Sequence, residues 1–192
     1  MSKSLILASA SPRRLELLTQ LGVSCEVIAA DVDETPQPGE PADDLVKRLA
    51  VAKTQSVAQI HPNRLVLAAD TLVYLSGPTE RIFGKPRDEN EASEFLAALS
   101  GTEHQVVTGL ALYDGGQIHC QSVKTVVTFA PIPEALRAQY CQSGEPLGKA
   151  GAYAIQGHGA RFVKSLNGSY SNVVGLPLYE TSVWLTQAGL IH

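Results

Sequence analysis

The sequence predicts an α/β fold, a mixed twisted sheet with flanking helices. Strand-like apolar runs alternate with helical patterns in the first part of the chain, which favours parallel strands. A long hairpin pattern follows, which adds antiparallel strands. The hydrophobic content of 44% is sufficient for a core, and no Pro- or Gly-rich linker divides the 192 residues. We therefore expect one domain spanning residues 1–192, built as two lobes with a cleft between them.

The first elements have clear end signals. Leu5–Ala8 is a short apolar run that predicts a buried strand. Pro12 suits the first position of a helix, with Ser11 as its N-cap and Gly22 just after its end. Cys25–Ala29 is then expected to form the second strand.

A helix beginning near Pro41 is indicated by an apolar stripe at helical spacing, formed by Leu45, Leu49, Ala52 and Val57. Leu65–Ala69 is a continuous apolar run, typical of a buried central strand, and Asp70 is expected at its carboxyl end. Asp88–Leu99 is predicted to be a helix because Asp88 and Glu91 have capping-box spacing; Gly101 follows its end.

Two strands, Gln105–Tyr113 and Ile118–Phe129, flank the turn signal at residues 114–117 and predict a hairpin. Pro133 is expected to start a helix that ends at Gly144. The remaining expected elements are strands at Lys149–Gln156 and Arg161–Lys164 and a closing helix at Leu178–Ala188.

Charge and cysteine content exclude several classes. The net charge of −4 argues against a nucleic-acid binder, because phosphate contacts require a basic surplus. No apolar run approaches the roughly 20 residues that span a bilayer, and the apolar stretch after Met1 is too short for a signal peptide. The three cysteines are far apart in the sequence and lack metal-site spacing. We expect a cytoplasmic protein with free thiols and no membrane or nucleic-acid partner.

The motif Ser9-Ala10-Ser11-Pro12-Arg13-Arg14 lies where a strand turns into a helix. The N–H groups at a helix N-terminus favour anions, and two hydroxyls and two guanidiniums beside them would complete a phosphate grip. The motif alone is equally consistent with a capping Ser11 and two solvated arginines.

Asp70 gives a sharper signal because a carboxylate at the end of a buried strand needs a partner, a metal ion or solvent. Ligands bind at the carboxyl ends of strands in open α/β sheets, so we favour a functional role for Asp70 and the neighbouring Thr71 over a simple turn cap.

Three other charged residues each leave two interpretations open. Glu34, in an acidic loop, either is solvated or binds Mg²⁺. Lys53, between apolar positions of the second helix, either extends its ammonium to solvent or faces the cleft. Lys85, in Gly84-Lys85-Pro86, is either an ordinary surface lysine or a phosphate-binding cation; the P-loop pattern is absent.

The segment Gly148–Gly157 is rich in small residues, which allow a ligand to approach the backbone closely. Gln156 within it could recognise a base edge with both its donor and its acceptor, although a tightly packed turn and strand is the alternative. Asn167–Asn172 is expected to be a polar turn, and His104 and His158 are expected to be structural.

Together these segments resemble the Maf family of nucleotide pyrophosphatases linked to septum formation. The resemblance covers nearly the whole chain and is highly specific in its order and spacing. Its motifs are Ser9-Ala10-Ser11-Pro12-Arg13-Arg14, Asp33-Glu34, Ala69-Asp70-Thr71, Gly84-Lys85-Pro86, Ser100-Gly101, His104, Thr108-Gly109, Lys149-Ala150-Gly151-Ala152-Tyr153, Gln156-Gly157 and Val174-Gly175-Leu176-Pro177.

The resemblance implies a mixed α/β fold with a deep cleft, similar to inosine triphosphate pyrophosphatases, and a homodimer. It implies house-cleaning of nucleotide pools and, for some members, a link to cell-division arrest. The branch that acts on dTTP and UTP is similar to this chain at three selectivity positions, Arg13, Thr71 and Gln156.

We therefore expect hydrolysis of dTTP or UTP to the monophosphate and pyrophosphate. Arg13, Arg14, Lys53 and Lys85 would neutralise the triphosphate, with Ser9 and Ser11 beside it. Glu34 and Asp70 would hold Mg²⁺ or Mn²⁺, and Asp70 would also accept the proton of the attacking water. Asp70 cannot be a tight metal ligand and a free base in one microstate, and the sequence leaves open how it divides the two roles. The alternatives are a nucleotide-binding regulator of septum formation without turnover and a nucleic-acid-binding division factor.

Overall fold

The computed structural model describes residues 4–191, which form two compact units. The first unit contains the chain up to Asp70, Thr108–Val123 and the chain from Gly175 onward. The second unit contains Thr71–Val107 and Lys124–Val174. The chain thus passes from one unit to the other between Asp70 and Thr71, within a single strand.

The strands form one mixed seven-stranded sheet in the order β2-β1-β3-β5-β6-β7, with β4 also paired to β3. β1 pairs in parallel with both β2 and β3. β4 is antiparallel to β3, and β7 is antiparallel to β6. The mixed α/β fold predicted from the sequence is therefore confirmed. The strands are β1 (Leu5–Leu7), β2 (Cys25–Val27), β3 (Leu65–Leu75), β4 (Arg81–Phe83), β5 (Glu103–Asp114), β6 (Gln117–Phe129) and β7 (Val163–Asn167).

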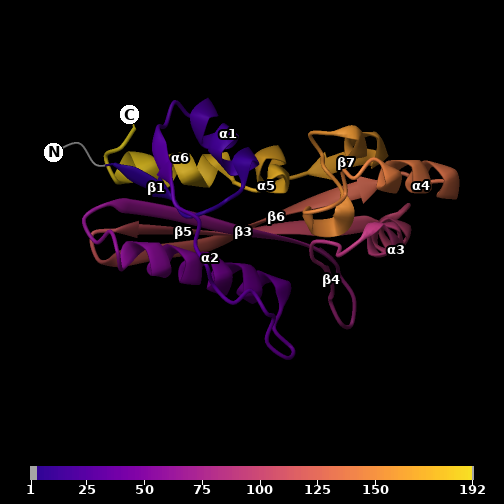
Figure 1. The fold of residues 1–192 in the computed structure, drawn as a ribbon, viewed down its shortest axis with the longest axis horizontal. Helices are drawn as coiled ribbons and strands as arrows, with labels where there is room; N and C mark the ends of the chain where they lie inside the picture. The colour runs from indigo at the N-terminus through magenta and orange to yellow at the C-terminus, as the bar shows by residue number, and fades with distance from the viewer. Residues whose placement is uncertain (1–3, 192) are drawn as a thin grey trace. The chain divides into compact units, whose positions relative to one another are not determined.

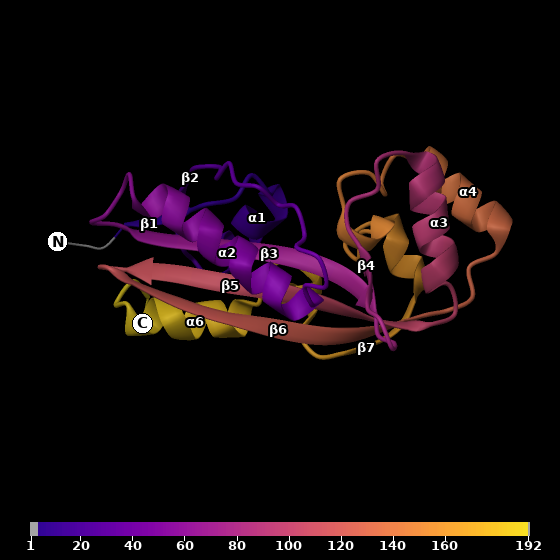
Figure 2. The same cartoon turned by 90° about the horizontal axis from the view of Figure 1, so that it is seen from below.

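Three helices cover the sheet of the first unit: α1 (Pro12–Gln20), α2 (Ala42–Ala58) and α6 (Leu178–Gln187). Figure 1 shows α2 on one face of the strands and α1 and α6 on the other, and Figure 2 shows α2 in front of β3. Their expected starts at Pro12, near Pro41 and at Leu178 are confirmed.

Helix α2 lies directly against β5. A Cβ atom on Gly109 would come within 2.2 Å of the carbonyl oxygen of Val46, so only glycine fits there. Eight residues further along the helix, the hydroxyl of Thr54 donates to the carbonyl oxygen of Ala111 at 3.3 Å. These two contacts fix the distance between the helix and the sheet.

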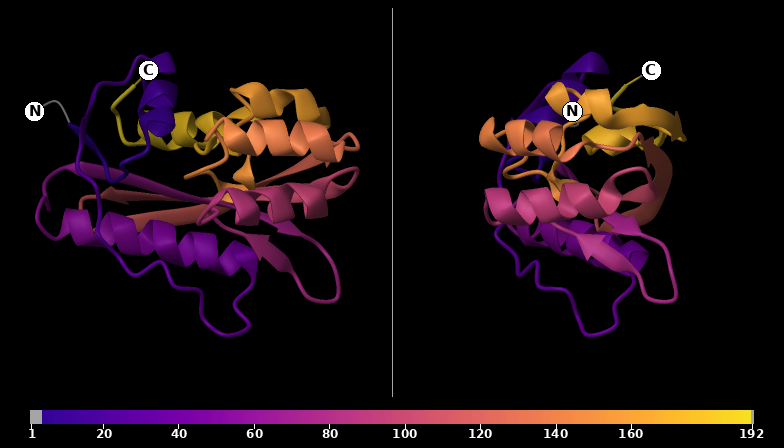
Figure 3. Two further views of the ribbon diagram at one scale, coloured as in Figure 1. Left: turned by 45° about the vertical axis from the view of Figure 1, so that its right-hand side comes forward. Right: turned by 90° about the vertical axis from the view of Figure 1, so that its right-hand side faces the viewer.

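The second unit contains α3 (Glu89–Leu99), α4 (Glu134–Gln142), the short α5 (Tyr170–Val174) and two 3₁₀ turns, η1 (Ala150–Ala152) and η2 (His158–Phe162). Helices α3 and α4 lie side by side (Figure 3). Asp88 caps α3 by accepting the N–H of Glu91, as its spacing predicts. Phe129 packs edge to face against His104, Tyr153 and Phe162 in the core of this unit.

Several predicted elements are wrong. Lys149–Gln156 is not a strand, because Gly151 and Ala152 have φ of 69° and 60° and fold the chain into the turn η1. Arg161–Lys164 is divided between η2 and β7, and the segment predicted as a polar turn continues into α5. β3 does not end at Asp70 but continues to Leu75, and the short β4 that pairs with its extension was not predicted.

Within residues 4–191, no helix has both the length and the apolar character needed to cross a membrane.

Candidate active site

The alternation of side chains along β3 directs Asp70 to the α2 face of the sheet. Val66 and Ala68 share a buried cluster with Val57 of α2, so they lie on that face. Because alternate residues of a strand point the same way, Asp70 lies on that face too. The parallel pairing with β1 ends near Leu67, so Asp70 lies just beyond the carboxyl end of β1. Ligands bind at that edge in α/β sheets.

Helical periodicity places Lys53 opposite Asp70. Leu49, Lys53 and Val57 are spaced by four residues and therefore share one face of α2. The ammonium of Lys53 donates to Asp70 Oδ1 at 2.6 Å, and both side chains are nearly buried. The ammonium of Lys53 therefore does not extend freely to solvent, and the other interpretation, that it faces the cleft, stays a prediction.

Glu34 joins the same ammonium from the acidic loop. Its Oε1 lies 2.5 Å from Lys53 Nζ, and its side chain is 51% exposed. Two carboxylates, one buried and one half exposed to solvent, thus share one cation. We call Glu34, Lys53 and Asp70 the carboxylate–lysine cluster.

Arg48 holds the loop that carries Glu34. Its guanidinium forms two hydrogen bonds with Glu40, at 2.6 and 2.8 Å, and a third with the carbonyl oxygen of Thr35 at 3.1 Å. This guanidinium lowers the pKa of Glu40 to about 2. Because Thr35 follows Glu34 directly, Arg48 restrains the backbone beside a cluster residue. The sequence analysis did not identify Arg48.

The loop between β1 and α1 brings Ser9 and Arg14 together. The Ser9 hydroxyl accepts the N–H of Ser11 at 3.2 Å and a guanidinium N–H of Arg14 at 3.0 Å. Arg14 also donates from Nε to the carbonyl oxygen of Gly175 at 2.8 Å. Arg14 is therefore a positioned side chain. Arg13 beside it is half-buried.

The charges around Arg14 connect this loop with the carboxylate–lysine cluster. Burial lowers the pKa of Arg14, and the charge of Arg13 lowers it further. The negative charges of Asp70 and Glu34 act in the opposite direction. An arginine stays protonated at neutral pH even so. The first unit therefore brings Ser9, Arg14, Glu34, Lys53 and Asp70 into one electrostatic neighbourhood.

Ser11 departs from the prediction. It occupies the N-cap position of α1, but its side chain makes no capping hydrogen bond. Its backbone N–H is bound by Ser9 instead. The half-buried Ser11 side chain consequently lies beside the N-terminus of α1 without serving as the cap.

Thr71, Lys85 and Gln156 belong to the second unit. Lys85 is exposed, and the carbonyl oxygen of Gly84 before it accepts the N–H of Gly151 at 3.1 Å. The Gly-Lys-Pro segment is therefore bound to the glycine-rich segment that leads to Gln156. Gln156 is exposed in a tight turn, and Thr71 is half-buried on β3.

His104 lies in the core, consistent with the structural role expected of it, and the structural role expected of His158 stays a prediction. His104 is buried, forms a hydrogen bond with the Tyr153 hydroxyl at 3.0 Å, and has its pKa lowered to about 4 by burial. It is neutral at pH 7. His158 is exposed, and its backbone N–H donates to Glu145.

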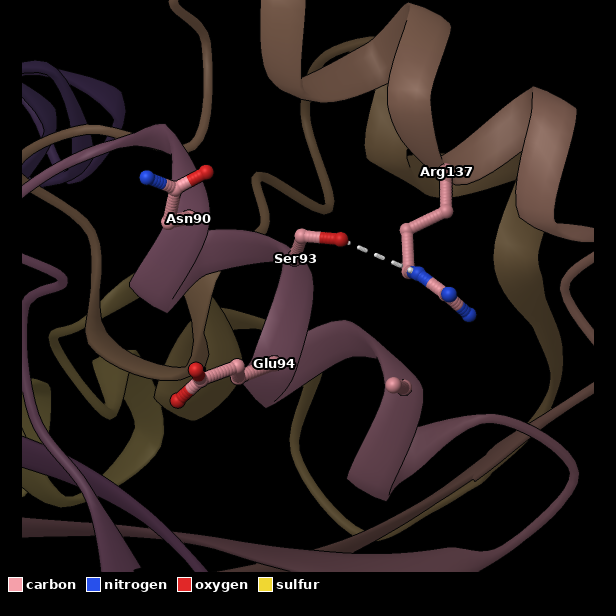
Figure 4. A pocket seen from close by; sticks show the side chains of 5 residues that line it. Asn90, Ser93, Glu94 and Arg137 are labelled. Atoms are coloured by element: carbon pink, nitrogen blue, oxygen red, sulfur yellow. Dashed lines mark hydrogen bonds between the residues drawn. The ribbon is translucent and has the colours of Figure 1, made fainter.

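A surface depression on the second unit is formed by residues other than the predicted site residues (Figure 4). It lies along α3 and is bordered by Arg137 of α4, which donates to the Ser93 hydroxyl at 3.2 Å. None of the predicted site residues lines it, and we assign it no function. The lining residues are Asn90, Ser93, Glu94, Ala97 and Arg137.

Glu34 and Asp70 are the residues of the carboxylate–lysine cluster that could bind a hard divalent cation. Carboxylate oxygens are the preferred ligands of Mg²⁺, which needs only one or two of them when substrate phosphates and water complete its shell. Within residues 4–191, no group of three His, Cys, Asp or Glu side chains could hold a metal without such help. Glu34 and Asp70 therefore suit an ion that arrives with a phosphate ligand.

The chain is similar to known proteins over most of its length. The family model described as "Maf-like protein" matches residues 4–188. A protein named "dTTP/UTP pyrophosphatase" from Pseudoalteromonas atlantica is 48% identical, with 98% of each chain covered. Another of the same name from Myxococcus xanthus is 53% identical over 97% of this chain and 93% of that protein.

Among solved structures, the chain is similar to a "Nucleoside-triphosphatase / dITP/XTP pyrophosphatase" from Mycobacterium abscessus, at 15% identity and a TM-score of 0.48, covering 97% of this chain and 95% of that one. The family model and the two relatives span nearly the entire sequence. The chain belongs to the Maf family.

Proposed function

We propose that this protein is a nucleoside triphosphate pyrophosphatase that converts dTTP and UTP to the monophosphate and pyrophosphate. The observation that carries the proposal is the carboxylate–lysine cluster at the carboxyl edge of the parallel strands, beside Arg14. Two relatives about 50% identical over nearly the whole chain have the name "dTTP/UTP pyrophosphatase", which supports the same substrates here.

In the reaction, a water oxygen attacks the α-phosphorus, and the bond from that phosphorus to the bridging oxygen breaks. Asp70 accepts a proton from the attacking water, and pyrophosphate leaves with the bridging oxygen. Lys53 keeps the carboxylate of Asp70 oriented through its 2.6 Å hydrogen bond. General-base assistance of this kind contributes typically about 10²–10⁴-fold.

In this proposal, several cations bind the triphosphate. Arg14, fixed by Ser9 and Gly175, contributes a preoriented guanidinium, and Arg13 contributes a second charge. Backbone N–H groups at the start of α1, with Ser11 beside them, add anion-binding donors. The resemblance to the Maf family implies that Lys85 supplies a further charge. Neutralisation and positioning are the main sources of catalysis in phosphoryl chemistry.

Glu34 and Asp70 are the residues that would hold Mg²⁺ or Mn²⁺ with the phosphates. Such an ion would neutralise the developing charge on the phosphate oxygens. Glu34 would be the more exposed of its two protein ligands, and Lys53 would orient Asp70.

Selectivity is assigned to Arg13, Thr71 and Gln156. The amide of Gln156 offers one donor and one acceptor, which complement the O4 and N3–H edge of thymine or uracil. Cytosine and adenine present the reversed pattern. Guanine presents the same acceptor and donor at O6 and N1–H, so its exclusion rests on the larger size of the purine ring. We further propose that the enzyme works in the cytoplasm as a homodimer and binds no nucleic acid.

Pyrophosphate release by the purified protein tests the proposal. The substrates are dTTP, UTP, dCTP, GTP and 7-methyl-GTP, each with wild-type protein and with Asp70→Asn. We expect dTTP and UTP to give similar kcat/KM values, well above those of the purine nucleotides. Nucleotide binding without pyrophosphate release would favour the regulatory alternative, and a preference for 7-methyl-GTP would overturn the assignment of substrate.

A further inference from the structure

Glu145, after helix α4, lies at the centre of a hydrogen-bond network that no sequence motif indicated. Its carboxylate accepts three hydrogen bonds: from the hydroxyl of Tyr140 at 2.8 Å, and from the backbone N–H groups of His158 and Gly159 at 3.0 and 3.1 Å. Burial opposes ionisation of Glu145, but these three donors hold its pKa below the ordinary value. The side chain is therefore a fixed anion at neutral pH.

The same network reaches both flanks of one tight turn. The N–H of Gly157 donates to the carbonyl oxygen of Ala154 at 3.1 Å, so Gln156 occupies a central position of a β-turn. On the N-terminal flank, the Tyr140 hydroxyl accepts the N–H of Ala154 at 3.1 Å. On the C-terminal flank, Glu145 binds His158 and Gly159 directly. The backbone on each side of Gln156 is thus held by one carboxylate.

Two glycines make this close approach possible. A Cβ atom on Gly157 would lie 2.5 Å from the Glu145 carboxylate, and one on Gly159 would lie 2.7 Å from the Tyr140 hydroxyl. Either atom would displace the network. The backbone of Glu145 is also restrained, because its carbonyl oxygen accepts a hydrogen bond from Lys149 Nζ at 2.6 Å.

We propose that Glu145 is a positioning residue for base recognition, which fixes the turn at Ala154–Gly157 so that the exposed Gln156 meets the pyrimidine edge in one orientation. This inference rests on the proposed function, since it requires that Gln156 contact the base. Glu145 makes no contact with substrate in this assignment and acts only through the turn. Without it, the amide of Gln156 samples several orientations, and its donor and acceptor no longer distinguish thymine from cytosine.

The test compares four variants with wild type: Gln156→Ala, Glu145→Gln, Tyr140→Phe and Glu103→Gln. Glu145→Gln keeps the size of the side chain but loses the charge and one acceptor. Tyr140→Phe removes only the hydroxyl that reaches Ala154. Glu103→Gln is the matched control, an exposed carboxylate of the same unit that accepts a hydrogen bond from the hydroxyl of Thr128.

Two readouts are measured on each. The first is the ratio of kcat/KM for dTTP to that for dCTP, and the second is backbone amide hydrogen exchange over residues 154–160. We expect Glu145→Gln to lower the ratio about tenfold, mainly through KM for dTTP, and to speed exchange about tenfold or more. Tyr140→Phe should give a smaller change in both, and Glu103→Gln none.

In the double variant Gln156→Ala with Glu145→Gln, the ratio should equal that of Gln156→Ala alone, because Glu145 acts only through Gln156. The inference fails if Gln156→Ala loses the base preference while Glu145→Gln and Tyr140→Phe keep it. If wild type releases no pyrophosphate, the proposed function is wrong. If Gln156→Ala keeps the wild-type base preference, the proposed contact between Gln156 and the base is wrong. If Glu145→Gln does not fold, the result for Tyr140→Phe decides.

Discussion

The two units hold their central carboxylates in different ways. In the first unit, Asp70 and Glu34 share the ammonium of a lysine side chain. In the second unit, Glu145 is bound by backbone N–H groups and a tyrosine hydroxyl. A lysine stem can rotate when a ligand arrives, whereas backbone donors move only if the turn unfolds. The first arrangement suits groups that act on a substrate, and the second suits a group that fixes a loop.

Metal removal gives the largest expected contrast between the units. Activity should be lost with EDTA and return with Mg²⁺ or Mn²⁺, because Glu34 and Asp70 offer oxygen ligands suited to a hard cation. Amide exchange around Gln156 should be unchanged by the same treatment, since Glu145 needs no ion. Full pyrophosphate release in exhaustively metal-free buffer would contradict the role of the first unit's carboxylates.

Asp70→Asn should reduce kcat by roughly 10²–10⁴-fold, because an amide cannot accept the proton of the attacking water. The thermal unfolding midpoint, measured alongside, should show a folded protein. Asp114→Asn, in the hairpin turn of the same unit, serves as the control and should keep wild-type kcat. A wild-type kcat in Asp70→Asn would remove Asp70 from the mechanism.

His104 makes the stability of the second unit sensitive to pH. Its pKa is about 4 in the folded protein against an ordinary value of 6.5, so the unfolded chain binds a proton first as pH falls. Stability is therefore fully present above pH 6.5 and is lost progressively toward pH 4, by about 3 kcal/mol. Urea unfolding of wild type and His104→Gln at several pH values measures this loss of stability. If the free energy of unfolding depends on pH equally in both proteins between pH 6.5 and 4.5, the prediction is refuted.

Removing Arg13 or Lys85 tests whether each cation contributes to phosphate binding. Arg13→Ala and Lys85→Ala should each lower kcat/KM for dTTP about tenfold or more, since a hydrogen bond to a charged group is worth about 1.5–3 kcal/mol. The steady-state kinetics of both variants provide the measurement. Retention of full activity by both would mean that the triphosphate is held by other residues.

The smallest effect is expected from Arg48, which holds the loop beside Glu34. Arg48→Ala should reduce kcat/KM about two- to fivefold and raise the Mg²⁺ concentration needed for half-maximal activity, consistent with the modest strength of partly exposed ion pairs. Arg64→Ala is the matched control, because Arg64 bonds with Ser4 and Glu26 elsewhere in the first unit. If Arg48→Ala and Arg64→Ala have equal kcat/KM values and equal Mg²⁺ requirements, Arg48 has no positioning role.

Elements with local end signals could be predicted from the sequence. Pro12, the capping residue Asp88 and the turn at residues 114–117 each act through neighbours a few positions away, and the helices and hairpin formed as expected. The prediction of a strand at Lys149–Gln156 failed because Gly151 adopts a positive φ that no composition pattern specifies.

The site residues could likewise be predicted only where their signal is local in the sequence. Asp70 and the Ser9–Arg14 motif could be proposed from their place after apolar runs, and their roles remain predictions. The partner of Lys53 could not be chosen, because that required the register between α2 and β3 in addition to helical spacing. Glu145 was missed since two of its three donors, His158 and Gly159, lie more than ten positions away and contribute only backbone atoms.

The absence of a side chain at Gly109 has a consequence for how tolerant this protein is to sequence change. Helix α2 rests on the strand at that point, with Val46 in direct contact, and Lys53 follows about two turns later on the same helix. An added methyl group would lift the helix and carry the ammonium away from Asp70. In a mutational scan, position 109 would therefore score like an active-site residue, although it has no functional group with which to take part in the chemistry.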